Sequence, residues 1–340
     1  MAAAAGKPSV KTALVLGLKI VASIALFAWL YRKVDWVNAE NTIVHARLEW
    51  LGAAFLLLFT SNVGGALQWN RLLRAAGIDI PFWKVLSYYH VGLFFNNFLP
   101  ANVGGDFARV LDASRASEVS RTTAFSTVLL DRMIGTVALG ALAVLTTLPG
   151  LDDSHLNFRM LLGLWGGALV FFTFTCLMLW AVFHPKLLAA IEGLLGRVGL
   201  GQLKPALDEL SERLAMFRGQ RRMFMELFAI ALGVQVMRIG VHVLVGRALG
   251  LTVPTAYFFL FVPLLAVIVS LPISFNGIGV REGAGIWLFG LVGLGQAAAF
   301  TLQFTTYLVA FAVSLIGGVV FLVRIPYRRA ESRTPRRPEE

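Results

Sequence analysis

Two interrupted apolar stretches decide the fold of this chain. Residues 94–109 read FFNNFLPANVGGDFAR, and residues 270–283 read SLPISFNGIGVREG. Each stretch begins as an apolar helix and then meets a proline, which lacks a backbone donor and clashes with the preceding turn. Glycines and polar residues follow before an apolar helix resumes. Irregular backbone at membrane depth is tolerated only inside protein or beside a water-filled cavity. The two stretches therefore predict broken helices that border a polar site.

The composition of the 340 residues identifies a membrane protein. Hydrophobic residues make up 57% and charged residues 14%, whereas soluble domains are about half apolar and about a quarter charged. This excludes a soluble globular protein and a disordered chain. The net charge of +11 would suggest nucleic acid in a soluble protein. Here the basic residues flank apolar runs, which predicts contact with the anionic cytoplasmic leaflet and no nucleic-acid partner.

Six further apolar stretches are each long enough to cross about 30 Å of hydrocarbon as a helix, which takes about 20 residues. Cytoplasmic loops retain Lys and Arg, which are frequent in residues 184–222 and in the tail and absent from residues 149–157 and 249–255. We therefore expect a multi-pass protein of a bacterial cytoplasmic (inner) membrane, with both termini in the cytoplasm. The predicted spans are residues 12–31, 50–70, 122–148, 158–183, 223–248 and 297–323.

The loop charges also give the direction of the broken stretches. Arg71, Arg74 and Lys84 place the entrance of the first stretch on the cytoplasmic side, and the next full span requires it to finish there. By the same reasoning the second stretch starts and finishes outside. We therefore predict an all-α integral membrane bundle with six full spans and two re-entrant hairpins, helix pairs that enter and leave the membrane on one face. The alternative is eight full spans.

The two broken stretches resemble each other, since Leu99-Pro100 lies 172 residues before Leu271-Pro272. With opposite entry faces, this predicts an inverted-topology repeat, an arrangement that builds secondary transporters. We place the two repeats at about residues 50–148 and 223–323. They belong to a single predicted membrane domain, residues 1–325.

Two segments outside the repeats are predicted to lie in the cytoplasm. Residues 326–340 are expected to form a basic cytoplasmic tail. Residues 185–222 are expected to contain a cytoplasmic amphipathic helix, which either lies on the inner leaflet or packs on the bundle. Its predicted apolar stripe consists of Leu203, Leu207, Leu210, Leu214 and Phe217.

Ionisable residues far from the ends of the predicted helices suggest an anion site, because a charge there costs a few kcal/mol on insertion scales. Arginine matches phosphate oxygens with parallel hydrogen bonds. The alternative is a set of internal ion pairs, such as Asp106 with Arg109 or Asp131 with Arg281. The predicted substrate-binding residues are Asn97, Asp106, Arg109, Asp131, Arg132, Arg238, Ser274, Asn276, Arg281 and Glu282. The predicted hinge residues are Pro100, Gly104, Gly105, Pro272, Gly277 and Gly279.

No residue pattern indicates catalysis by a metal or a nucleophile. The one cysteine, Cys176, lies in an apolar run, and none of the five histidines has a metal-ligand spacing. The glycines of the broken stretches follow no strand and precede no Gly-Lys-Ser/Thr, so they do not form a nucleotide loop. We expect no catalytic residue, no metal and no cofactor.

Three motifs occur in order along the chain: NxLPxxxGGDxxR at residues 97–109, LDRxxG at 130–135 and LPISxxGxGxREG at 271–283. With them the chain resembles the lysylphosphatidylglycerol synthase transmembrane-region family, also called flippase-like domain proteins, over about residues 12–325. The resemblance implies an integral membrane bundle. Family members fused to an aminoacyltransferase domain are similar to a flippase that carries aminoacylated phosphatidylglycerol to the outer leaflet. Stand-alone members are linked with hopanoid, glycolipid or other lipid pathways.

The chain departs from the fused members after its last predicted span, where only a short tail rich in Arg and Pro follows. We therefore expect the lipid-handling membrane half without the lysyl-transfer enzyme.

The expected function is that of a lipid translocase, or flippase-like protein, that handles an anionic or aminoacylated phospholipid or a related lipid headgroup. The alternative is a membrane-embedded enzyme that modifies a lipid by glycosyl-type or aminoacyl-type transfer, or a scaffold for such an enzyme. The expected partners are a membrane phospholipid or lipid-linked substrate, the anionic leaflet and a separate lipid-synthesising enzyme.

Overall fold

A computed structural model describes residues 40, 42–98, 104–117, 119–147, 158–184, 204–270, 277 and 279–331. Within these residues all regular structure is helical, and five helices are long and apolar enough to cross a membrane. They correspond to five of the six predicted spans, and the predicted span at 12–31 lies outside the described residues. The expectation of an α-helical membrane bundle is therefore confirmed at this level. The five helices are α3 (Leu48–Ala75), α6 (Arg121–Thr146), α7 (Phe158–Val182), α10 (Arg221–Ala248) and α13 (Gln296–Glu331).

The long helices present apolar side chains outward, as a lipid environment requires. In α7 only 17% of the most apolar 18-residue stretch is buried. Large apolar side chains such as Phe174, Leu177 and Trp180 are exposed on this helix. An exposed apolar surface of this extent is typical of a membrane contact. The described helices therefore have the outer surface of a membrane protein.

Local signals end α3 five residues later than its apolar run predicts. The helix continues through Arg71 and Arg74 and stops before Gly77, which has a φ of +75°. The N–H of Ile78 donates to the carbonyl of Leu73 at 2.9 Å, and that of Gly77 to the carbonyl of Arg74 at 3.0 Å. This left-handed glycine cap closes the last turn and leaves both arginines on the helix.

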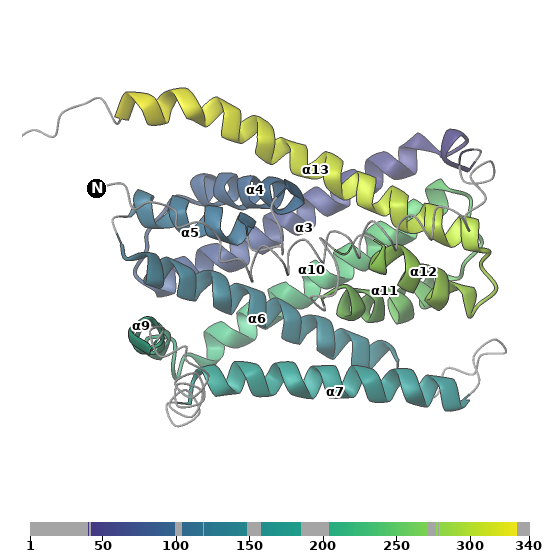
Figure 1. The fold of residues 1–340 in the computed structure, drawn as a ribbon, viewed down its shortest axis with the longest axis horizontal. Helices are drawn as coiled ribbons and strands as arrows, with labels where there is room; N and C mark the ends of the chain where they lie inside the picture. Colours follow the sequence, from purple (N-terminus) through teal and green to yellow (C-terminus); the bar gives the residue numbers. More distant parts are fainter. Residues whose placement is uncertain are drawn as a thin grey trace, which may run out of the picture. The chain divides into compact units, whose positions relative to one another are not determined.

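Each broken stretch consists of two short helices that pack against each other. The first contains α4 (Phe82–Phe98) and α5 (Gly104–Ala116), and the second contains α11 (Thr255–Ser270) and α12 (Val280–Gly290) (Figure 1). At 1.5 Å per residue even α4 is about 25 Å long, shorter than the hydrocarbon core. The predicted hinge prolines, Pro100 and Pro272, lie outside the described residues.

Small residues allow α4 to approach its neighbours closely. A Cβ on Gly105 of α5 would overlap the carbonyl oxygen of Gly92 on α4, and the N–H of Gly105 donates to Oδ1 of Asn96 at 2.9 Å. On another side of α4, a Cβ on Gly317 of α13 would overlap the backbone of His90. The backbone of α4 is therefore held directly against α5 and α13.

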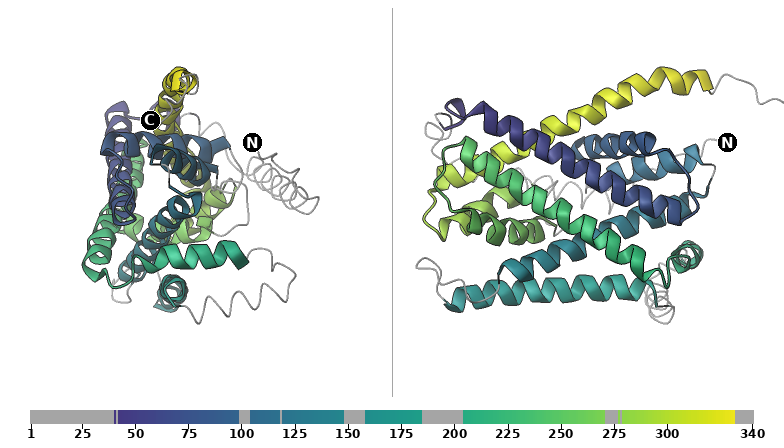
Figure 2. Two further views of the ribbon diagram at one scale, coloured as in Figure 1. Left: turned by 90° about the vertical axis from the view of Figure 1, so that its left-hand side faces the viewer. Right: turned by 180° about the vertical axis from the view of Figure 1, so that it is seen from behind.

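The chain divides into two compact units by its internal contacts. Unit 1 comprises Met1–Ala54, Leu139–Phe172 and Ile239–Tyr307, and unit 2 comprises Phe55–Ala138, Thr173–Arg238 and Leu308–Glu340. α4 and α5 belong to unit 2, and α11 and α12 belong to unit 1. Within unit 2, α3 and α10 lie side by side (Figure 2), where Gly64 would meet Val234.

The core of unit 2 includes α9 (Lys204–Ala215), which lies within the predicted amphipathic segment. Leu214 of α9 and Phe217 just after it are buried in a cluster with Leu72 of α3 and Leu227 of α10. The carboxylate of Glu209 accepts hydrogen bonds from Thr122 at 3.0 Å and Ser120 at 3.3 Å, at the start of α6. Leu214 and Phe217 of the predicted apolar stripe therefore pack on α3 and α10, with Leu210 partly buried against the same cluster.

The α4–α5 crossing can be tested with Gly105→Ala. The new methyl group overlaps the Gly92 carbonyl, and overpacking of this kind costs about 1–3 kcal/mol. Gly163→Ala in α7 is the matched control, because a Cβ there meets nothing within 4 Å. Thermal unfolding in detergent, followed by tryptophan fluorescence, measures both variants. Equal unfolding midpoints for the two would contradict the close crossing.

Candidate functional site: a charge network on α5 and α6

Arg109 of α5 is the centre of a charge network in unit 2. The residue is buried, with 4% exposed, and its Nη2 donates to Oδ2 of Asp131 on α6 at 2.7 Å. Its guanidinium carbon lies 4.2 Å from the ring centre of Trp69 and 4.7 Å from that of Tyr89. A cation held over aromatic faces is stabilised by the ring quadrupoles. Arg109 therefore has a charged partner and an aromatic cage.

Asp131 is the point where α3, α5 and α6 meet. Its Oδ1 accepts a hydrogen bond from Nε2 of Gln68 on α3 at 2.9 Å, whereas its Oδ2 accepts the bond from Arg109. Gln68 also donates to the backbone carbonyl of Asp131 at 3.2 Å. Next to it, Nε1 of Trp69 donates to Oγ1 of Thr127 at 3.0 Å. The buried carboxylate is thus satisfied from two sides, as a buried charge requires.

Asp106 and Arg132 form the second half of the network. Nε of Arg132 donates to Oδ2 of Asp106 at 2.9 Å, and Nη2 donates to Oδ1 at 2.9 Å. This is the bidentate geometry in which Arg–carboxylate pairs are strongest. Nη1 of Arg109 lies 3.6 Å from Oδ1 of Asp106, which joins the two pairs. The four residues therefore combine two positive and two negative charges.

The two pairs differ in exposure. The side chains of Arg109 and Asp131 are 5% and 8% exposed, whereas that of Arg132 is 48% exposed. Asp131 and Arg132 lie about 15 Å along α6 from its first residue, Arg121, close to half of a hydrocarbon core. The network thus has a closed half and an open half, and Arg132 is the open cation.

Asn97 of α4 lies outside this network and forms a hydrogen bond with α13. Its Nδ2 donates to Oγ of Ser314 on α13 at 2.8 Å and to the carbonyl of Leu93 at 3.2 Å. Farther along α13, Nη1 of Arg324 donates to Oδ2 of Asp112 at 3.0 Å. These bonds fix α13 to α4 and α5 in unit 2.

In unit 1, Arg281 and Glu282 have separate roles. The guanidinium carbon of Arg281 lies 5.0 Å from the ring centre of Tyr307. Oε2 of the buried Glu282 accepts a hydrogen bond from the N–H of Gly279 at 2.7 Å and so caps the start of α12. Gly277 and Gly279 have φ values of +74° and +82°, a left-handed conformation that favours glycine. Glu282 therefore has a structural role at this helix start.

A buried amide in unit 1 lacks a partner. Gln303 of α13 is fully buried, and neither its Nε2 nor its Oε1 has a hydrogen-bond partner. Its side chain packs against Gly285 of α12, where a Cβ would overlap it. Gln303 lies 172 residues after Asp131, the same separation as that of the two Leu-Pro pairs.

The structure brings together four of the predicted site residues, Asp106, Arg109, Asp131 and Arg132. Arg238 is partly buried on α10, one turn after Gln235, whose Nε2 donates to the carbonyl of Gly135 at 3.0 Å. Ser274 and Asn276 lie outside the described residues. Among the described residues no group of three or more His, Cys, Asp or Glu is placed to hold a metal ion.

Sequence reasoning missed three members of the site and one ion pair. Gln68, Trp69 and Tyr89 surround Arg109 and Asp131, and Asp112 pairs with Arg324. Gln68 carries a usable signal, because it is a polar side chain near the end of an apolar run. The aromatic residues carry none, since they resemble the other apolar core positions of their helices.

Comparison with known proteins agrees with the motif resemblance. The family model for the lysylphosphatidylglycerol synthase TM region matches residues 14–318. A UPF0104 membrane protein of Pyrococcus horikoshii is 26% identical over 314 residues, which cover 84% of this chain and 91% of that protein. A UPF0104 membrane protein of Methanothermobacter thermautotrophicus is 34% identical over 116 residues, 34% of this chain and 31% of that protein. A third, from Methanocaldococcus jannaschii, is 28% identical over 97 residues, 28% of this chain and 29% of that protein.

These relatives support a location in a membrane but not the bacterial origin that we expected. All three organisms are archaea. The prediction of a multi-pass membrane protein therefore holds, and its bacterial part has no support from the relatives.

The buried half of the network can be tested with Asp131→Asn. The variant leaves the Arg109 guanidinium buried without its nearest carboxylate, and loss of one partner of a buried pair costs about 3–5 kcal/mol. Asp79→Asn is the control, because Asp79 is exposed and such surface changes stay within about 0.5 kcal/mol. The unfolding free energy in detergent is the measurement. A D131N protein as stable as D79N would show that the pair does not hold α5 and α6 together.

Proposed function

Because the chain belongs to the lysylphosphatidylglycerol synthase transmembrane-region family, we propose that it is a lipid translocase for an anionic or aminoacylated phospholipid. The observation that carries this proposal is the ion pair of Asp106 with the half-exposed Arg132, about midway along the membrane-length helix α6. Ionisable side chains at membrane depth are costly to insert, and a pair of them there is therefore a candidate functional site.

The chemistry of the open pair suits a phospholipid headgroup. A lipid phosphate, like a carboxylate, can accept two parallel hydrogen bonds from a guanidinium group, so it can replace Asp106 as the bidentate partner of Arg132. A cationic aminoacyl group can then pair with the released Asp106. The acyl chains stay in the bilayer, and the headgroup moves along the polar side of α5 and α6.

The buried pair keeps this site in shape. Arg109 and Asp131 are held by Gln68 and by the Trp69 and Tyr89 rings, so their geometry does not depend on a ligand. Arg109 also lies 3.6 Å from Asp106 and offers that carboxylate an alternative partner while Arg132 binds phosphate. The energetic cost of opening the Asp106–Arg132 pair is thereby reduced.

The proposed topology keeps six spans and two re-entrant hairpins related by an inverted repeat. The short lengths of α4, α5, α11 and α12 support re-entry, because none reaches the thickness of the hydrocarbon core. Arg109 and Arg281 are 172 residues apart, and each lies over an aromatic ring. This likeness between the two hairpins supports the repeat.

Transport can be tested in vesicles that contain the purified chain and fluorescent phosphatidylglycerol. A membrane-impermeant quencher measures how fast the labelled lipid changes leaflet. Arg132→Gln is expected to slow this movement about tenfold or more, since charge-assisted hydrogen bonds to the phosphate are lost. Arg159→Gln, at an exposed arginine of α7, is the control and is expected to transport at the wild-type rate.

The same assay separates the alternatives. Equal transport by wild type, R132Q and protein-free vesicles would contradict the proposal. Mass spectrometry of the vesicle lipids would reveal a new lipid species if the chain were an enzyme instead.

A further inference from the structure

A second charged site lies in unit 2, formed by residues that the charge network does not use. A cavity of about 470 Å³ lies at the end of α3 and the start of α10. Four arginines and one glutamate line it, together with Gly219, Gln220 and Met223. The charged residues are Arg71, Arg74, Arg221, Arg222 and Glu226.

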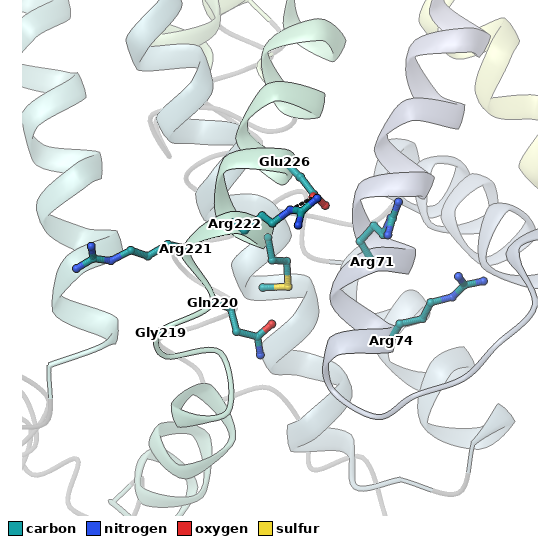
Figure 3. A pocket seen from close by; sticks show the side chains of 8 residues that line it. Arg71, Arg74, Gly219, Gln220, Arg221, Arg222 and Glu226 are labelled. Atoms are coloured by element: carbon teal, nitrogen blue, oxygen red, sulfur yellow. Dashed lines mark ion pairs between the residues drawn. The ribbon is translucent and has the colours of Figure 1, made fainter.

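Two helix ends bring these side chains together. Arg71 and Arg74 are three residues apart near the end of α3, so they lie on one face. Gly219, with a φ of +80°, reverses the chain before α10. Figure 3 shows Arg222 and Glu226 extending from α10 toward α3, whereas Arg221 extends away from it. Arg71 and Arg74 line the cavity from α3 and Arg222 lines it from α10, and in this view the Arg74 side chain extends away from α10.

The positive charge of the cavity exceeds its negative charge. Nε of Arg222 lies 3.4 Å from Oε1 of Glu226, and its side chain is 96% exposed. In the part of the chain that the structure describes, Arg71 and Arg74 have no carboxylate within ion-pair distance. Like charges gathered in this way repel one another unless an anion binds among them. The first N–H groups of α10 add a partial positive charge at the same place.

We propose that this cavity binds the phosphate of an anionic phospholipid before or after the lipid reaches the charge network. The guanidinium groups of Arg71 and Arg74 would bind the phosphate oxygens from α3, and Arg222 would bind them from α10. Met223 gives the cavity an apolar wall that suits the glycerol and the first acyl carbons. The loop charges predict that this end of the helices faces the cytoplasmic leaflet, where anionic headgroups lie.

α3 connects the two sites. Gln68, which binds Asp131, precedes Arg71 by three residues, or about 4.5 Å of helix rise. A lipid phosphate leaving the cavity therefore has α3 as a continuous guide toward the network. The choice of a phospholipid as the ligand rests on the proposed function, whereas the binding of a phosphate group rests on the cavity alone.

The test is an equilibrium titration of the full chain in neutral detergent with soluble dihexanoyl phosphatidylglycerol, measured by calorimetry. The double variant R71Q/R74Q is expected to bind about tenfold more weakly or worse, because charge-assisted hydrogen bonds are lost. Glu226→Gln releases Arg222 from its ion pair and is expected to bind more tightly than wild type. A variant that merely misfolds would not gain affinity.

The matched control is R47Q/R159Q, which removes two positive charges from exposed positions outside the cavity and is expected to bind as wild type does. Equal affinity of R71Q/R74Q and wild type, or an equal loss in the control, would overturn the site. A parallel titration with inorganic phosphate identifies the source of the anion. Tighter binding of the lipid supports the phospholipid, whereas tighter binding of phosphate alone would overturn the assignment to a lipid.

The titration does not depend on transport. Loss of lipid binding in R71Q/R74Q with vesicles that show no transport at all would leave this site standing and refute the proposed function. Normal transport together with unchanged lipid binding in R71Q/R74Q would refute this site and leave the proposed function standing.

Discussion

A charge inside a membrane must have a partner, and this constraint organises unit 2. Arg109 is buried on a short helix, so it needs Asp131 on α6 and the Trp69 and Tyr89 rings around it. Asp131 in turn needs Gln68 on α3. The close approach of Gly105 to Gly92 brings α5 near enough to α4 for Tyr89 to reach Arg109. The contacts of one buried guanidinium group thus connect α5 to α3, α4 and α6.

The apolar runs and the interruptions in them were enough to predict most of the described fold. The runs locate the five long helices to within a few residues, except at the end of α13, which continues to Glu331. The interruptions in the runs correctly predict that α4 and α5, and likewise α11 and α12, are separate helices. The helix ends were harder to predict. α3 extends beyond its apolar run through Arg71 and Arg74, and α10 begins at Arg221, before its apolar run. Arginine is a good helix former but is not apolar.

The four charged residues of the candidate site were predicted, and the contact of Asp106 with Arg109 was named as an alternative, but the Arg109–Asp131 and Arg132–Asp106 pairs were not predicted. Asp106, Arg109, Asp131 and Arg132 stand out because ionisable residues are rare in apolar runs. Which carboxylate binds which arginine depends on the crossing of α5 and α6, and sequence spacing does not fix that crossing. Glu282 illustrates a second limit, since a carboxylate that caps a helix has the same sequence signal as one that binds a ligand. In the sequence, Arg71 and Arg74 served only to place the entrance of the first broken stretch on the cytoplasmic side, and they did not indicate a cavity.

The central claim is that Asp106 of α5 and Arg132 of α6 form a direct ion pair that holds the two helices together. The most direct measurement is the thermal stability of the charge-exchanged protein D106R/R132D beside its two single variants. Each single variant places two like charges side by side, and each should unfold at a clearly lower temperature than wild type. The account predicts that the exchanged pair recovers a large part of that loss. An exchanged protein no more stable than the worse single variant would contradict it.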